Sequence, residues 1–121
     1  MTSEILKARF KKFAIETALL IRDLPKNVIN NAYCNQLIRS SSSAGANYRA
    51  ACRAKSSADF INKLKIVEEE LDESIFFIEL LKEFNESFRE RMDHLISEAE
   101  ELLSIIVTTI ITMKLKSGSK S

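Results

Sequence analysis

Residues that make turns are nearly absent from this chain of 121 residues, which contains only two glycines and one proline. Sandwiches, barrels and βαβ folds need many turns, and turns favour glycine, proline and a few similar residues. A chain with so few of them must run in a few long segments. Apolar residues make up 45% of the chain and charged residues 29%, a balance typical of a globular domain. At this length we expect one all-α domain.

Two helices are expected in the first half of the chain. Apolar side chains recur every three to four positions from residue 3 to residue 22, which is the spacing of one helix face. Pro25 follows and cannot continue a helix, and Asn27 is a candidate N-cap for a second helix. We expect this second helix to reach about residue 54.

Two further helices are expected in the second half. Ser56 with Asp59, and later Ser87 with Glu90, have the spacing of a capping box, and each pair precedes an apolar stripe of helical period. The fourth helix is expected to end between residues 113 and 115.

Four helices with short connections predict an antiparallel, up-down-up-down four-helix bundle. We expect this bundle to form a single domain over residues 1–115. Residues 116–121 are polar and include Gly118, and we expect them to be a disordered tail.

The end of the fourth helix is unusually apolar. Residues 105–112 are all β-branched and, taken alone, would favour a strand. A lone strand has no partner, so the helical period prevails. A helix that is apolar nearly all round must be buried on more than one side. It is either the hydrophobic end of the bundle or a subunit interface. We expect the interface, and hence a homo-oligomer.

Charge is distributed unevenly, although the net charge is only +1. Residues 1–57 carry +7, residues 58–101 carry −9 and residues 102–121 carry +3. The two halves of the chain either neutralise each other when they pack together, or leave a basic face opposite an acidic one.

Nothing in the sequence indicates export or a membrane. Charged residues interrupt the first helix pattern, and the most apolar run, residues 102–115, is too short to span a bilayer. Cys34 and Cys52 lie about 27 Å apart along the expected second helix, which excludes a disulfide between them. We therefore expect a cytoplasmic protein without a membrane partner.

The second helix has a basic face opposite its apolar stripe. Placed at about 100° per residue, Arg39, Arg49 and Arg53 lie on this face with no acid among them. They span about 21 Å, enough to contact several phosphates of a nucleic acid or several carboxylates of a partner. The same arginines could instead be solvated or pair with the acidic third helix. The candidate binding residues are Arg39, Arg49, Arg53 and Lys55.

Signals for catalysis are weak. Residues 40–46 are four serines followed by Ala-Gly-Ala, and such small side chains let another helix approach closely, but no catalytic serine arrangement surrounds them. The Glu-x-x-His pairs of di-iron bundles are absent. Glu90, His94 and Glu98 share a stripe that could hold a metal weakly or form salt bridges. We expect no enzyme activity, no cofactor and no metal.

The most specific pattern in the chain is QLIRSSSSAGANYR over residues 36–49, followed by Asp59, Phe60, Ile61 and Leu64. This pattern resembles the bacterial four-helix-bundle family named for proteins encoded in 23S ribosomal RNA intervening sequences, also called the S23 family. The resemblance covers essentially the whole chain in length and helix order. The family is similar in fold to the accessory variability determinant of diversity-generating retroelements.

The resemblance implies a homo-oligomeric ring of four-helix bundles, a pentamer in the retroelement relatives, whose basic surface binds nucleic acid and a reverse transcriptase. Arg39, Asn47 and Arg49 match the family's pattern, whereas Ala50 stands where the family usually has an acid. The implied partners are other copies of this chain, RNA or DNA, and another protein such as a reverse transcriptase.

Two functions therefore remain open. The first is an oligomeric nucleic-acid or ribonucleoprotein accessory protein whose arginines contact phosphate. The second is a protein interaction scaffold in which the same arginines pair with the acidic third helix of a neighbour. Replacing Arg39, Arg49 and Arg53 should abolish nucleic-acid binding in the first case and disassemble the oligomer in the second.

Overall fold

Four long α-helices make up most of residues 1–119, the part of the chain that the computed structural model describes. They are α1 (Ser3–Asp23), α2 (Val28–Ala51), α3 (Ser57–Phe84) and α4 (Arg89–Ser119), and a short 3-10 turn, η1 (Glu86–Phe88), precedes α4. Residues 1–119 contain no strand, and the β-branched run at 105–112 is helical throughout. The all-α prediction is confirmed.

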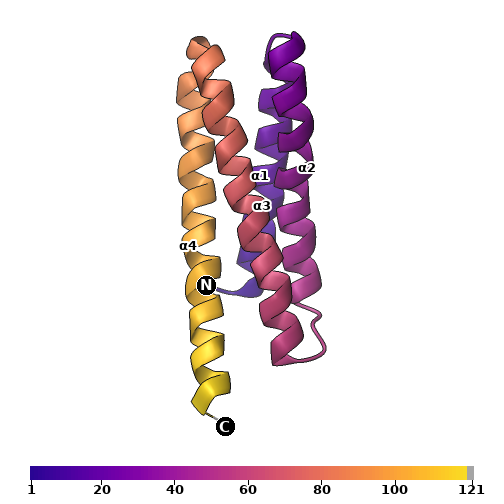
Figure 1. Cartoon of the computed structure of the whole chain (residues 1–121), viewed down its shortest axis with the longest axis vertical. Coiled ribbons are helices and arrows are strands. Elements are labelled where there is room, and N and C mark those ends of the chain that lie inside the picture. Colours follow the sequence, from indigo (N-terminus) through magenta and orange to yellow (C-terminus); the bar gives the residue numbers. More distant parts are fainter. Residues whose placement is uncertain (120–121) are drawn as a thin grey trace.

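The helices lie side by side along the long axis of the molecule, and the chain turns back at each connection (Figure 1). α1 contacts α2 and α4, and α3 also contacts α2 and α4. Within the described residues, the backbones of α1 and α3 make no close contact, nor do those of α2 and α4. α1 and α3 therefore occupy opposite corners of a four-helix bundle.

Side-chain caps position the starts of the first three helices. Asn27 accepts a hydrogen bond at 2.8 Å from the backbone N–H three residues further on, and Ser56 does the same at 3.1 Å. Thr2 caps α1 in the same way at 3.2 Å. The caps predicted for α2 and α3 are confirmed, because each oxygen satisfies a backbone donor that the first turn leaves unpaired.

The start of α4 differs from the prediction. Ser87 lies inside η1 instead of capping a helix. The chain turns at Asn85, which is only 6% exposed and exchanges two amide hydrogen bonds with Asn30, both of 2.9 Å. Asn85 also donates to the Leu81 carbonyl at 2.8 Å. This buried amide pair fixes the connection between α3 and α4 against the start of α2.

Two helix ends also differ from the prediction. α2 ends at Ala51 because the chain tightens there, with the N–H of Arg53 bonded at 3.0 Å to the carbonyl three residues back. α4 passes the expected domain end at residue 115 without a break, so residues 116–119 of the predicted tail are helical. No proline stops the helix, and Gly118 costs only about 1 kcal/mol. Residues 120 and 121 of that tail lie outside the described residues.

The core combines apolar side chains from all four helices, and the small-residue segment of α2 brings its neighbours close. A Cβ atom added at Gly45 would lie 3.3 Å from the Cβ of Phe10 on α1. On the other side, Ser74 of α3 donates a hydrogen bond of 2.9 Å to the hydroxyl of Ser40. The predicted close approach at residues 40–46 is confirmed on both faces of α2.

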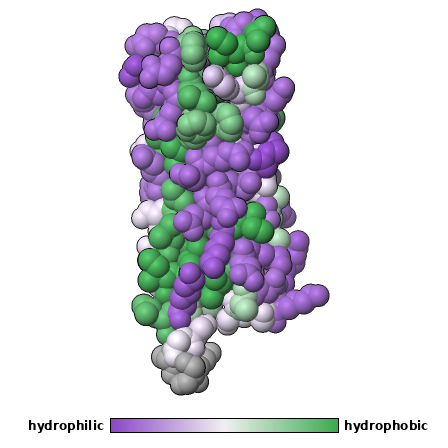
Figure 2. Space-filling view, viewed as in Figure 1, coloured by the Kyte–Doolittle hydropathy of each residue, from purple (hydrophilic) through white to green (hydrophobic). Residues whose placement is uncertain are grey.

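The apolar end of α4 is covered on one side only. Ile106 and Ile110 are buried in the core, but Ile111 is 54% exposed and Leu115 is 70% exposed. Figure 2 shows hydrophobic surface along the lower part of the α4 edge.

None of the helices in residues 1–119 has the length and hydrophobicity needed to span a membrane. Both cysteines are free thiols, and burial raises the pKa of Cys34.

Asp23 links the end of α1 to α4 and makes the stability of the fold depend on pH. Its carboxylate accepts hydrogen bonds of 3.0 Å from Arg22 and from Arg91, and these bonds lower the pKa of Asp23. A lowered folded pKa stabilises the fold above the usual carboxyl pKa of about 4, and this contribution is lost as the pH falls through the folded value. We expect Asp23→Asn to lower the urea midpoint near pH 7 and the two midpoints to converge near pH 2. A constant difference between the two midpoints would contradict this.

Candidate nucleic-acid interface

Arg39, the first of the predicted binding residues, is engaged within its own protomer. Its guanidinium lies 3.0 Å from a carboxylate oxygen of Glu70 on α3 and also pairs with Glu73. Glu73 and Glu70 raise the pKa of Arg39 above its ordinary value. The side chain is 49% exposed, but its charge is balanced. The sequence left three roles open for Arg39: partner binding, solvation, or ion pairing with the acidic third helix. The structure shows the ion pairing.

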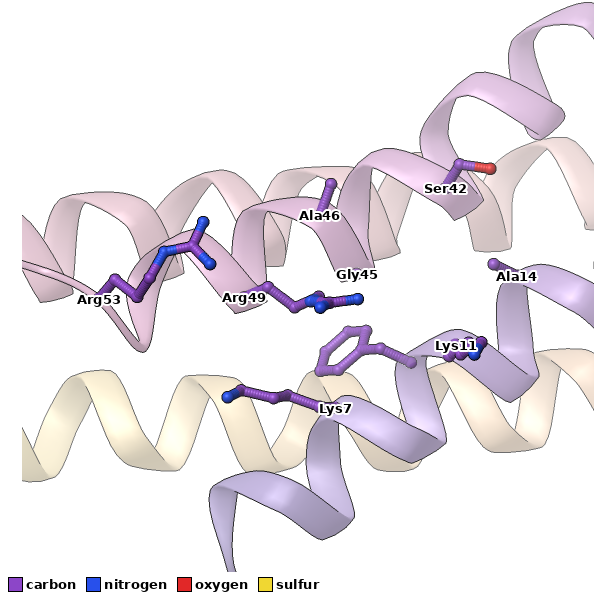
Figure 3. A pocket seen from close by; sticks show the side chains of 9 residues that line it. Lys7, Lys11, Ala14, Ser42, Gly45, Ala46, Arg49 and Arg53 are labelled. Carbon is purple, nitrogen blue, oxygen red and sulfur yellow. The ribbon is translucent and has the colours of Figure 1, made fainter.

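Arg49 and Arg53 lie in a different place, along a groove between α1 and α2. Lys7 and Lys11 of α1 border the same groove, which has a volume of about 460 Å³ (Figure 3). The floor is made of small side chains and one ring, namely Phe10, Ala14, Ser42, Gly45 and Ala46. We call the set of Lys7, Lys11, Arg49 and Arg53 the groove cations. Among the described residues, no acidic side chain lines this groove.

The local sequence explains how the groove forms. Lys7 and Lys11 are one helical turn apart, so they share a face of α1, and Arg49 lies one turn after Gly45 on α2. Gly45 lets the two helices approach closely, and the long cationic side chains line the groove beside this contact, with Arg49 extending across it below Gly45 (Figure 3). The uncharged floor leaves space between them.

Most of the groove charge is not neutralised within the protomer. Lys7 pairs at 3.1 Å with Glu4, which is itself 79% exposed. Lys11, Arg49 and Arg53 form no ion pair with any residue of 1–119. Three cations and a partly neutralised fourth therefore surround one hollow, an arrangement that attracts a polyanion.

Lys55 lies outside the groove. Its backbone N–H donates a 3.1 Å hydrogen bond to Asp59, and its side chain borders a separate shallow hollow beside Phe60 and Met113. Lys63 first, and then the Lys55 N–H, lower the pKa of Asp59. The four predicted residues therefore fall into three places, and only Arg49 and Arg53 are brought together.

On the stripe considered for a metal, two of the three residues contact side chains of α1 instead. His94 lies 3.5 Å from Glu16 of α1, whereas Glu98 pairs with Arg9 at 2.7 Å. Among residues 1–119 there is no cluster of three histidine, cysteine or acidic side chains that could hold a metal ion.

Comparisons with known proteins agree with this architecture. The family model of 23S rRNA-intervening sequence proteins matches residues 5–108. A crystal structure of a protein of unknown function from the S23 ribosomal protein family of Bacteroides thetaiotaomicron is similar with a TM-score of 0.79 and 31% sequence identity, covering 91% of this chain and 98% of that one. No curated protein matches the chain. The chain belongs to the 23S rRNA-intervening sequence protein family.

Proposed function

We propose that this protein is a non-enzymatic accessory protein that binds the phosphate backbone of RNA or DNA in the groove between α1 and α2. The observation that carries the proposal is the set of groove cations, three of which have no acidic partner in the described chain. The proposed architecture is an antiparallel, up-down-up-down bundle that assembles into a homo-oligomeric ring, with five copies by resemblance. A reverse transcriptase or another protein is a further proposed partner.

The chemistry of the groove suits phosphates better than base edges. Guanidinium groups bind phosphate oxygens through paired N–H donors, and lysines add point charge. Arginine and lysine can also contact guanine, but the edges of adenine and cytosine are read mainly by amide and carboxylate groups. Within residues 1–118, the lining has one uncharged polar side chain, Ser42, and no amide or carboxylate. We therefore expect affinity that depends strongly on salt.

Assembly would strengthen this binding. A single groove offers few phosphate contacts, and binding through so few contacts is weak at physiological salt. Repetition of the groove around an oligomer would let one strand occupy several copies, and each further contact would then be intramolecular.

The test uses the double variant Arg49→Gln/Arg53→Gln. We expect its affinity for a fluorescent RNA or DNA duplex, measured by anisotropy, to fall about tenfold or more at low salt, because two phosphate contacts are lost. Between about 50 and 200 mM salt, the slope of log K against log salt should shrink by about 2. The mass measured by light scattering should stay unchanged.

The matched control is Arg22→Gln/Arg89→Gln. It removes the same charge from two exposed arginines, which lie at the end of α1 and the start of α4, away from the groove. We expect this control to bind like the wild type. Equal losses in both double variants would show a general charge effect, and a wild-type protein that binds neither duplex would overturn the proposed function.

A second candidate function is a protein scaffold. It is favoured by an acidic hollow of about 430 Å³ on α3, lined by Glu69, Asp72, Glu73, Ile75, Phe76 and Glu79. Because Arg39 already pairs within its own protomer, a scaffold must use other cations to reach this hollow. A protein that assembles but ignores nucleic acid would favour this second function.

A further inference from the structure

α1 carries a second, mostly apolar stripe on the side away from the core. Ala8, Lys12, Ile15 and Leu19 are spaced four, three and four residues apart, which is the spacing of a seam between two helices. All four are exposed, Ile15 by 50% and Leu19 by 39%. The buried residues of α1 form a different stripe, Leu6, Phe10, Phe13, Thr17 and Leu20. We call Ala8, Lys12, Ile15 and Leu19 the outer α1 stripe.

α3 carries a complementary stripe on its own outer side. Glu69, Asp72, Phe76 and Glu79 are spaced three, four and three residues apart, and we call them the outer α3 stripe. They border the acidic hollow, and the Phe76 side chain is 53% exposed at its centre. An exposed aromatic ring among acids suits a partner helix that is apolar and basic.

The two stripes face away from each other. α1 and α3 occupy opposite corners of the bundle, and each stripe lies on the side of its helix remote from the core. One protomer can therefore offer its outer α1 stripe to one neighbour and its outer α3 stripe to another. Contacts of this head-to-tail kind build rings when the rotation closes.

The stripes also lie at matching heights along the bundle. Gly45 of α2 is level with Phe10 of α1, and Ser40 of α2 is level with Ser74 of α3. Ser40 precedes Gly45 by five residues, and Ile15 follows Phe10 by five residues. Because α1 and α2 run in opposite directions, both lie about 7.5 Å further along the bundle in the same direction. Ile15 is therefore level with Ser40 and with Ser74. By the same rise, Lys12 and Asp72 differ in height by about 1.5 Å.

The apolar residues match as well. Phe76 follows Ser74 by two residues and so lies about 3 Å further along α3. This height falls between those of Ile15 and Leu19 on α1. A neighbour placed side by side, with its helices running in the same direction and the copy rotated about the long axis as a ring requires, would therefore receive the ring of Phe76 between two apolar side chains and set an acid against a lysine. Neither Lys12 nor Asp72 forms an ion pair within residues 1–119.

We propose that a second copy of this chain docks its outer α1 stripe on the outer α3 stripe, with Lys12 of one protomer opposite Asp72 of the next. This inference rests on the assembly part of the proposed function and names its interface. It assigns a role to exposed apolar residues and unpaired charges that the fold and the groove leave unexplained.

The test is a charge exchange followed by light scattering at fixed protein concentration. The single variants Lys12→Glu and Asp72→Lys each place like charges opposite each other, and we expect each to lower the mass from a multiple of 13.8 kDa towards that of the monomer. The double variant Lys12→Glu/Asp72→Lys restores opposite charges, and we expect the assembly to return. Val28→Ser, which removes a side chain that is 87% exposed and in neither stripe, should leave the mass unchanged.

The alternative results are distinct. Single variants that keep the wild-type mass, or a double variant that does not recover it, would overturn the interface. A wild-type protein that stays monomeric would also overturn it and would leave the stripes to another partner. The groove is tested by a different comparison. The anisotropy titration asks whether Arg49→Gln/Arg53→Gln binds nucleic acid more weakly than the wild type, whatever mass the protein has.

Discussion

Replacing Phe10 by alanine is expected to lower the free energy of unfolding by about 3–5 kcal/mol, the largest effect of any single change proposed for this chain. Phe10 is 1% exposed and stacks on Tyr48 of α2, with ring centroids 5.0 Å apart and planes 19° from parallel. Its Cβ meets Gly45, which has no side chain to fill the cavity. Loss of the Phe10 ring would weaken the packing of α1 against α2 and remove part of the groove lining.

The measurement is urea unfolding followed by circular dichroism, at one protein concentration because assembly adds to stability. Phe84→Ala is the matched control, since it removes the same ring from a position that is 55% exposed, and we expect it to cost about 1 kcal/mol or less. Similar losses for the two variants would contradict the role given to Phe10.

The second large effect is expected from the buried amide pair of Asn30 and Asn85. Asn85→Ala leaves the Asn30 side chain with a buried oxygen and one N–H that have lost their partners, which should cost about 1–3 kcal/mol. Asn30→Ala should cost a similar amount for the same reason. Because the two residues satisfy each other, the double variant should cost less than the sum of the single variants.

A double-mutant cycle in urea measures this coupling, which we expect to be about 0.5–3 kcal/mol. Additive losses would show that the two amides act independently. Asn27→Ala provides a comparison, because it removes the cap that accepts from the Asn30 backbone N–H and leaves both side-chain amides of the pair in place.

Most of the fold follows from local signals in the sequence. Long helices follow from the lack of turn residues, and the caps at Asn27 and Ser56 follow from residue type and position. Ser87 was expected to cap the fourth helix by the same rule, and that expectation is wrong. There a tertiary contact prevails, since the turn forms where Asn85 can reach Asn30, which lies 55 positions earlier in the chain.

The candidate site is predicted only in part for a similar reason. The arginines of α2 share a face in any helical projection, but a projection of one helix does not show which helix packs against it. Arg39 lies beside the acids of α3, whereas Arg49 and Arg53 lie beside Lys7 and Lys11 of α1. Lys7 and Lys11 are not among the residues predicted from the sequence. The signal that could have found them is their spacing of one turn on a helix expected to meet the small residues at 40–46.

α1 makes fewer contacts with the rest of the bundle than any other long helix, yet it carries half of the groove cations and one side of the proposed seam. Regions with few contacts are those that open locally at the lowest free energy. A strand bound in the groove and a neighbour docked on the outer α1 stripe would each favour the closed state of the same helix. Nucleic-acid binding and self-assembly would then be thermodynamically linked, each tightening the other by the same factor through the docking of one helix.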